Sequence, residues 1–310
     1  MKRNVFAAAA IAVSAAAPAA YAEPGAEPAK RPPAPYSLPW QLRSAGVGSS
    51  ARLDTTLAVH DDGSDAWNET VVTMLSFSYK VAPWAAPVVR LGYVVNATHA
   101  ADGSAELGSA FANPVLGMMF APKLSDPWRV SFFLGNTLPV GEGGGDAPAA
   151  EKATAMQMGS LTRSGLDGTM FSPNYIAFVP GADLAYVAYG FTIQGELTLI
   201  QYFRTRGEEN PKSADAARTA GVVAMHIGYF FVPSFSVGAD LRYQLWVRNP
   251  SVPDDSVGRD NFTFAGGARA HIPLGPKAWF RPGLSYGRVM DNPMRDSHYN
   301  IVQLDLPFSF

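Results

Sequence analysis

Charged side chains that alternate with apolar neighbours are the residues of this sequence best placed to do chemistry. In "SFSVGADLRYQLW", Asp240 and Arg242 fall on one face while Leu241 and Tyr243 fall on the other. An ionisable group in such an apolar setting must face protein or water and find a partner. Side chains of this kind are expected to line a common interior, here called the lumen: Arg90, Arg129, Asp183, Glu196, Asp240, Arg242, Arg269, Arg281 and Asp305. The same phase includes Arg52, Asp54, Lys80 and Arg204.

Two interpretations of these charges stay open at the level of sequence. Arginines in excess over acids would line a narrow hydrated path and raise the local concentration of anions in it. Alternatively, the same groups would form a salt-bridged filling that stiffens the interior and closes the path. Both interpretations place the charges inside and the apolar positions outside.

Catalytic, metal and cofactor chemistry have little basis in this sequence. There is no cysteine, and the histidines on the lumen phase, His226 and His271, stand in no recognisable hydrolase motif. The remaining histidines fall in or near predicted outer loops: His60, His99 and His298. Because 24 Lys and Arg face 26 Asp and Glu without a basic patch, a nucleic-acid partner is not expected. The sequence predicts no catalytic residue, no metal site and no cofactor.

The elements that carry the charges are predicted to be β-strands, because apolar and polar residues alternate with period two. Each segment is long enough for the roughly 9–11 tilted residues with which a strand crosses a bilayer. The alternation predicts about twelve strands, near 50–60, 69–81, 86–97, 113–122, 127–139, 174–188, 190–203, 219–231, 234–247, 260–272, 277–289 and 298–310.

The links between these segments alternate between short and long, as in a transmembrane barrel with tight periplasmic turns and larger outer loops. Aromatic residues stand beside the short links and suggest an interfacial girdle: Trp84, Trp128, Phe191, Phe235 and Trp279. We therefore expect an all-β fold, a closed antiparallel transmembrane β-barrel of about 12 strands with longer outer loops.

Two segments raise the question of a helix. Residues 219–239 carry no Lys, Arg, Asp or Glu over a length that spans a bilayer. Gly228 and Pro233 interrupt them, and the alternation continues on both sides, which favours two strands. Residues 149–164, within the long loop 142–172, are good helix formers. A short helix is expected there, either folded inward as a constriction or lying on the outer rim.

The last segment, "YNIVQLDLPFSF", resembles the closing strand of Gram-negative outer-membrane barrels, with alternating apolar positions and a terminal Phe310. In that family the terminal strand is recognised by the insertion machinery. The resemblance implies Phe308 and Phe310 as the assembly signal, insertion machinery and outer-membrane lipid as partners, and the cell outer membrane as location. A second stretch, "FANPVLGMMFAP" followed by "WRVSFFLGNTLPVGEGGG", is similar to outer-membrane transporters of the meta-pathway phenol-degradation family.

The chain is expected to have three parts. Lys2 and Arg3, an apolar run and Ala20-Tyr21-Ala22 predict a signal peptide at 1–22. A Pro-rich periplasmic segment would follow at 23–48, and the outer-membrane barrel at 49–310. The predicted function is a channel or transporter for small solutes, with hydrophobic or aromatic compounds among the candidates. The alternative is a structural or adhesive barrel that acts through its outer loops.

Overall fold

The computed structural model describes residues 43–44, 46–61, 67–163, 167–207, 217–248, 260–291, 294–296 and 298–310. The expected signal peptide and the Pro-rich segment as far as residue 42 lie outside these described residues.

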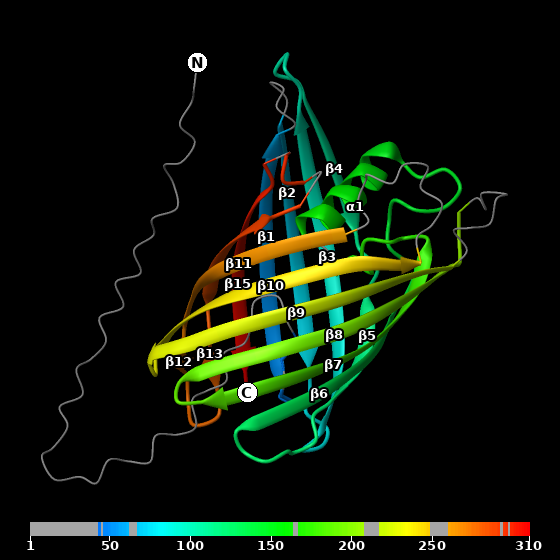
Figure 1. Ribbon diagram of the computed structural model, residues 1–310. Coiled ribbons are helices and arrows are strands. Elements are labelled where there is room, and N and C mark those ends of the chain that lie inside the picture. The colour runs from blue at the N-terminus through cyan, green and yellow to red at the C-terminus, as the bar shows by residue number, and fades with distance from the viewer. Residues whose placement is uncertain are drawn as a thin grey trace, which may run out of the picture. The chain divides into compact units, whose positions relative to one another are not determined.

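The described chain forms one antiparallel sheet that closes on itself (Figure 1). Its elements are β1 (Ser50–Asp61), β2 (Trp67–Ser78), β3 (Ala85–His99), β4 (Ala105–Phe111), β5 (Val115–Phe120), β6 (Trp128–Thr137), α1 (Ala150–Thr162), β7 (Tyr175–Ala188), β8 (Phe191–Arg204), β9 (Ala217–Val232), β10 (Phe235–Arg248), β11 (Asp260–Ala270), β12 (Ile272–Pro273), β13 (Trp279–Phe280), β14 (Gly283–Val289) and β15 (Asn300–Ser309).

Closure comes from β15, which pairs with β14 on one edge and with β1 on the other. In Figure 1 the red strand β15 accordingly lies beside the blue strand β1. In three places two consecutive strands follow each other end to end and occupy a single strand position in the wall: β4 with β5, β11 with β12, and β13 with β14. The fifteen strands therefore make a wall of twelve, and the predicted closed antiparallel barrel is confirmed.

The two faces of the wall differ as the alternation predicts. Along β8, Ile193 and Leu197 are 46% and 61% exposed, whereas Gln194 and Glu196 between them are 0% and 6% exposed. With no water in the bilayer core, a spanning sheet must satisfy its backbone internally, and closure does this. The outer face of the barrel is thus apolar, and the inner face carries the polar and charged side chains together with a buried apolar cluster.

Aromatic residues ring the outside of the barrel at the end with the short turns. Trp84 stacks on Phe120 with ring centroids 6.1 Å apart, and Trp128 meets Tyr186 edge-on at 5.2 Å. Of the five predicted girdle residues, Trp84, Trp128, Phe191 and Phe235 are exposed. The prediction was wrong for Trp279, which is half-buried and pairs with Ser309 on the inner face of the wall. This end is taken as the periplasmic end, because short turns face the periplasm in such barrels.

One wall strand differs from the prediction. Residues 98–112 were expected to form an outer loop, but residues 105–111 form β4, which extends the line of β5 along β3. Ala105–Phe111 is rich in small residues and shows little alternation, so the sequence carries no clear strand signal there. The line is broken between Ala112 and Pro114, where proline has no N–H to donate to a ladder.

The uncharged stretch at 219–239 forms the hairpin of β9 and β10, which turns at Pro233 and Ser234. Among the described residues, no helix is long and apolar enough to cross a membrane.

Candidate functional site: a charged lumen closed from both ends

The helix of the long outer loop packs inside the barrel. Ala155 and Met156 of α1 are buried in the same apolar cluster as the inward-facing residues of β2 and β3. Gly108 on β4 makes room for the helix backbone, since a Cβ there would lie 3.0 Å from the carbonyl carbon of Glu151. Of the two placements left open by the sequence, the structure has the inward one.

Asn113 holds this loop in place at the break between β4 and β5. Its Nδ2 donates to the carbonyl of Ser172 at 2.8 Å, and its Oδ1 accepts from the N–H of Gly141 at 2.8 Å. Its backbone N–H donates to the carbonyl of Met170 at 2.8 Å. One buried residue of the wall therefore ties down both ends of the inward loop.

Arg43 closes the lumen from the other end. Its Nη1 donates to Thr198 at 2.9 Å, and its Nη2 lies 3.4 Å from Asp183. Its backbone N–H donates to Glu196 at 3.2 Å, and its carbonyl accepts from Gln194 at 2.6 Å. Both the side chain and the backbone of Arg43 are thus bound to the inner face of β7 and β8.

The sequence assigns residues 23–48 to a Pro-rich periplasmic segment, and the structure describes residues 43, 44 and 46–48 of this range. Residues 43, 44 and 46–48, which the structure describes, lie along the inside of the barrel and line a cavity there. The physical reason is the pairing of Arg43 with buried acids on distant strands, which the Pro-rich composition of the segment does not reveal.

A chain of alternating arginines and acids runs along the wall from α1 toward the periplasmic end. Asp54 lies 3.0 Å from Nη1 of Arg163 and 3.7 Å from Nη2 of Arg52. Asp305 accepts from Nε of Arg52 at 2.6 Å and from Nη2 of Arg269 at 2.5 Å. Each aspartate is held between two guanidinium groups, which compensate its buried charge.

A second branch begins at the same arginine. Asp167, in the loop after α1, accepts from Arg163 at 2.8 Å and from Arg90 at 2.9 Å. Burial alone would raise the pKa of Asp167, but the two guanidinium groups outweigh it and bring this pKa to about 2. Asp167 is therefore a carboxylate that binds the loop to the wall at β3.

Two of the cavities in the described part of the lumen are lined by the N-terminal segment. The smaller one, about 60 Å³ and called the inner cavity, is lined by charged residues that include Arg43, Asp54, Arg163, Asp167, Glu196 and Arg242. The larger one, about 320 Å³ and called the periplasmic vestibule, lies among residues at the short-turn end such as Ser49, Ser78, Arg281 and Ser309. Four residues line both cavities and form the constriction between them: Arg43, Arg52, Ser76 and Arg90.

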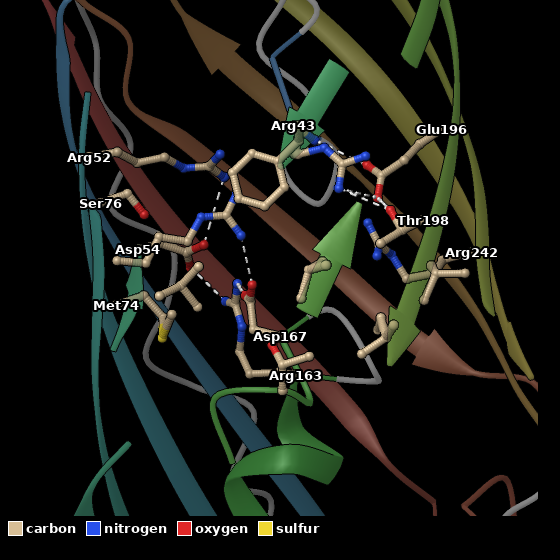
Figure 2. A pocket seen from close by; sticks show the side chains of 17 residues that line it. Arg43, Arg52, Asp54, Met74, Ser76, Arg163, Asp167, Glu196, Thr198 and Arg242 are labelled. Atoms are coloured by element: carbon tan, nitrogen blue, oxygen red, sulfur yellow. Dashed lines mark hydrogen bonds and ion pairs between the residues drawn. The ribbon is translucent and has the colours of Figure 1, made fainter. Parts of the chain in front are cut away.

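Figure 2 shows how the charges divide around the inner cavity. Arg43, Glu196 and Thr198 lie together on one side, and Arg52, Asp54, Arg163 and Asp167 lie on the other. The two groups are carried by different segments, so the inner cavity depends on the N-terminal segment and on the inward loop at once.

Most of the predicted lumen residues lie on the inner face. Those exposed by 6% or less are Asp183, Glu196, Asp240, Arg242, Arg269 and Asp305. Arg90 and Arg281 are half-buried and line the cavities. Arg129 also lines the vestibule, but its Nη1 binds Asp126 of the adjoining turn at 2.9 Å. Lys80 lies past the end of β2 and is exposed.

The predicted assembly residues, Phe308 and Phe310, belong to the end of β15 and pack on each other with centroids 5.6 Å apart. Their recognition by insertion machinery stays a prediction. Three further lumen residues were missed by the sequence reasoning: Arg43, Arg163 and Asp167. None of them stands in a strand, so no alternation marks which way it points.

Inward histidines form two buried pairs with neighbours on adjacent strands. Ser236 Oγ lies 2.8 Å from Nε2 of His271, and Nδ1 of His226 contacts Asp240. All four residues are 1% exposed, so these groups bind each other within the wall. Within the described ranges, no group of three or more His, Asp or Glu side chains is placed to hold a metal ion.

Comparisons with known proteins show the fold. No family model matches the chain, and no curated protein matches it significantly. Among solved structures, an outer-membrane channel from Pseudomonas putida F1 is similar with a TM-score of 0.53 and 12% identity, covering 87% of this chain and 98% of that one. The NanC porin is similar with a TM-score of 0.50 and 12% identity, covering 83% of this chain and 100% of that one. Closed barrel, apolar outer face and aromatic girdle together identify the protein as an outer-membrane β-barrel protein.

Proposed function

We propose that the protein is an outer-membrane channel for small solutes with a preference for anions. The observation that carries this proposal is the lumen charge network, defined as the arginines Arg43, Arg52, Arg90, Arg129, Arg163, Arg242, Arg269 and Arg281 with the acids Asp54, Asp167, Asp183, Glu196, Asp240 and Asp305. In this network the arginines outnumber the acids, eight to six, and they still do so, seven to six, without Arg129, which is paired with Asp126 of an exposed turn.

An excess of fixed positive charge in a low-dielectric channel attracts anions and repels cations. The network also passes from the inner cavity through the constriction to the vestibule, so a permeating ion would meet guanidinium groups throughout. The two solved barrels of similar fold are described as a porin and a channel, which agrees with this proposal.

The inner cavity is small, so the state described here is narrow. At about 60 Å³ it has room for roughly two water molecules at liquid density. We therefore expect small conductance steps that grow when Arg43 or the inward loop leaves the lumen.

Reconstitution in planar bilayers tests the proposal. Under a salt gradient, the purified barrel should give small single-channel conductance steps. The reversal potential should shift toward the equilibrium potential of the anion. Arg90→Gln should reduce the anion preference, and a tenfold change in selectivity needs only about 1.4 kcal/mol. Arg295→Gln is the control, because Arg295 is an exposed outer arginine beside Asp296. This variant should leave the anion preference unchanged. A correctly folded barrel without any conductance would favour the structural or adhesive alternative instead.

A second candidate, transport of hydrophobic or aromatic compounds, is favoured by a seam in the wall. The strand line is broken at Asn113, and the free edge of β4 is met by the loop residue Glu142, whose N–H donates to the carbonyl of Phe111 at 2.8 Å. The N–H of Phe111 in turn donates to the carboxylate of Glu142 at 2.9 Å. Behind this seam lies an apolar cluster that includes Met156 and Met170. The same candidate is expected from the resemblance of two sequence stretches to the meta-pathway phenol-degradation transporters, a resemblance that no family model bears out.

A reversible crosslink separates the two candidates. The chain has no cysteine, so Phe111→Cys with Glu142→Cys would introduce a single disulfide across the seam. If hydrophobic cargo leaves through the seam, uptake of an aromatic hydrocarbon into proteoliposomes should fall in the oxidised form and recover on reduction. Anion conductance, which uses the lumen, should not change.

A further inference from the structure

The periplasmic vestibule has an unusual charge distribution. Five arginines line it, namely Arg43, Arg52, Arg90, Arg129 and Arg281, and no aspartate or glutamate is among its described lining residues. Serine hydroxyls complete the polar part of the lining: Ser44, Ser49, Ser50, Ser76, Ser78 and Ser309. The described lining of the cavity thus presents hydrogen-bond donors and positive charge, and the acids that pair with its arginines lie behind that lining.

The acids that pair with these arginines lie away from the vestibule. Arg90 reaches Asp167 of the loop after α1, and Arg129 reaches Asp126 of a turn. In each case the acid is bound by Nη1. A guanidinium carries five N–H donors in a rigid fork, so one such bond fixes its orientation without using its donor capacity. Arg90 and Arg129 therefore keep N–H donors that no acid binds, whereas Arg43 and Arg52 each pair with two acids.

Arg281 differs from the other four, because it forms no ion pair with an acid among the described residues. Its Nε is buried without a hydrogen-bond partner, and its guanidinium lies 5.6 Å above the ring of Trp279. Its backbone is fixed, since its N–H donates to Pro307 at 2.9 Å and its carbonyl accepts from Arg269 at 2.6 Å. A fixed cation with unused donors at a cavity wall is a group that an oxyanion satisfies.

We propose that the periplasmic vestibule is a binding site for small oxyanions, bearing carboxylate or phosphate groups, with Arg281 as a principal binding residue. Its volume of about 320 Å³ corresponds to roughly ten water molecules, which accommodates such an anion with part of its hydration. The ligand is a free solute, because the arginines and serines that line the vestibule lie on the inner side of a closed wall that separates them from lipid. The proposal rests on the proposed channel function for its physiological meaning, but binding at equilibrium requires no ion flow.

Isothermal titration of the purified barrel in a phospholipid-free, non-ionic detergent tests the site. The titrants are succinate and inorganic phosphate, with the uncharged succinamide as the matched analogue. We expect saturable binding of at least one anion, no binding of succinamide, and a weakening of at least tenfold in Arg281→Gln. Arg295→Gln, on an exposed outer loop, should bind as the wild type does. Arg281→Lys should retain part of the affinity, because the charge remains while the fork is lost.

The position of Trp279 gives a second readout. Anion binding at Arg281 should change the tryptophan fluorescence of the wild type, and Trp279→Phe should abolish that change while leaving the calorimetric binding in place. Absence of binding by both anions, equal binding of succinamide, or an unchanged affinity in a folded Arg281→Gln variant would each overturn the proposal. Binding that requires added anionic phospholipid vesicles would do the same, because the site would then recognise a lipid. An anion-selective current without binding would refute the site alone, and binding without current would refute the channel alone.

Discussion

The guanidinium of Arg43 lies directly against the bare Cα of Gly181: a Cβ built on this glycine would be 2.6 Å from Cζ of Arg43. Arg43 belongs to the N-terminal segment and Gly181 to the middle of β7, so the contact joins parts of the chain that are distant in sequence. Only glycine leaves room for the arginine to reach Asp183 and Glu196.

Gly181→Ala should therefore displace Arg43 while the barrel still folds, since the colliding atoms are the end of a flexible side chain. With the constriction loosened, single-channel conductance should rise. Gly195→Ala is the matched control on the neighbouring strand, because nothing lies within 4 Å of a Cβ at that position. Equal conductance for the two variants and the wild type would mean that Arg43 does not limit the path.

Arg163→Gln should release the loop that follows α1. Arg163 is the shared partner of Asp54 and Asp167, and removing one member of a buried ion pair costs roughly 3–5 kcal/mol because charges are left uncompensated. We expect faster amide hydrogen exchange over residues 167–171 with an unchanged exchange pattern in the strands. Lys152→Gln, which changes an exposed arm of α1, should leave residues 167–171 as protected as before.

Leu241→Arg should impair membrane insertion. Leu241 lies on the outer face of β10, opposite Met225 on β9 and Phe264 on β11, both of which are exposed. A charge on the lipid face near the midplane costs roughly 2–4 kcal/mol. Arg242→Leu, one residue along, keeps the outer face apolar and should still insert, with its effect confined to the lumen. Equal loss of folded barrel in urea titrations of both variants would contradict the strand phase.

Glu142 should give a pH-dependent contact at the start of the inward loop. It accepts from Lys152 at 2.5 Å and from the N–H of Phe111 at 2.9 Å, and these bonds hold the pKa of Glu142 below its ordinary value. Because the pKa of Glu142 is lowered in the folded protein, the contact stabilises the fold at pH values above the ordinary glutamate pKa. This stabilisation is lost as the pH falls through the lowered pKa of the folded state. The same pairing raises the pKa of Lys152, so the contact is also lost when pH rises above the raised lysine value.

The amide proton of Phe111 reports this titration. Its chemical shift should change with a midpoint below about 4.3, the usual value for glutamate, and Glu142→Gln should abolish the change. A midpoint at or above that value would show that the pair does not persist in solution.

The wall of the barrel was predictable because the bilayer imposes one rule on every strand. Along β8 and β15 most outward positions are apolar, and Gln194, Glu196, Gln303 and Asp305 mark the inward phase, although Ile200 and Ile301 also point inward. The strand β4 was not predicted, because its residues Gly108, Ser109 and Ala110 fit either face of the wall. This strand also lies against the inward loop.

The contents of the lumen were less predictable. Alternation shows that Asp305 and Arg52 point inward, but their 2.6 Å contact arises only when the last strand meets the first. Arg43 and Arg163 come from irregular segments whose composition fits solvent as well as an interior. Which partners Arg43 and Arg163 bind depends on the shape of the folded interior, for example on the space left by Gly181. The spacing of residues in the sequence does not reveal that shape.

The junction between β1 and β15 also has a mechanical consequence. Its pairs run from Ser50 with Ser309 at the periplasmic end to Val59 with Asn300 at the outer end, and the N–H of Phe310 donates to Ser49 at 3.1 Å. Since the two strands are antiparallel, a force that draws residues 49 and 310 apart loads the pairs one after another, as in a zipper. A force along the barrel axis would instead load all of them together, in shear. The junction should therefore be weak toward peeling from the periplasm and strong toward stretching across the membrane.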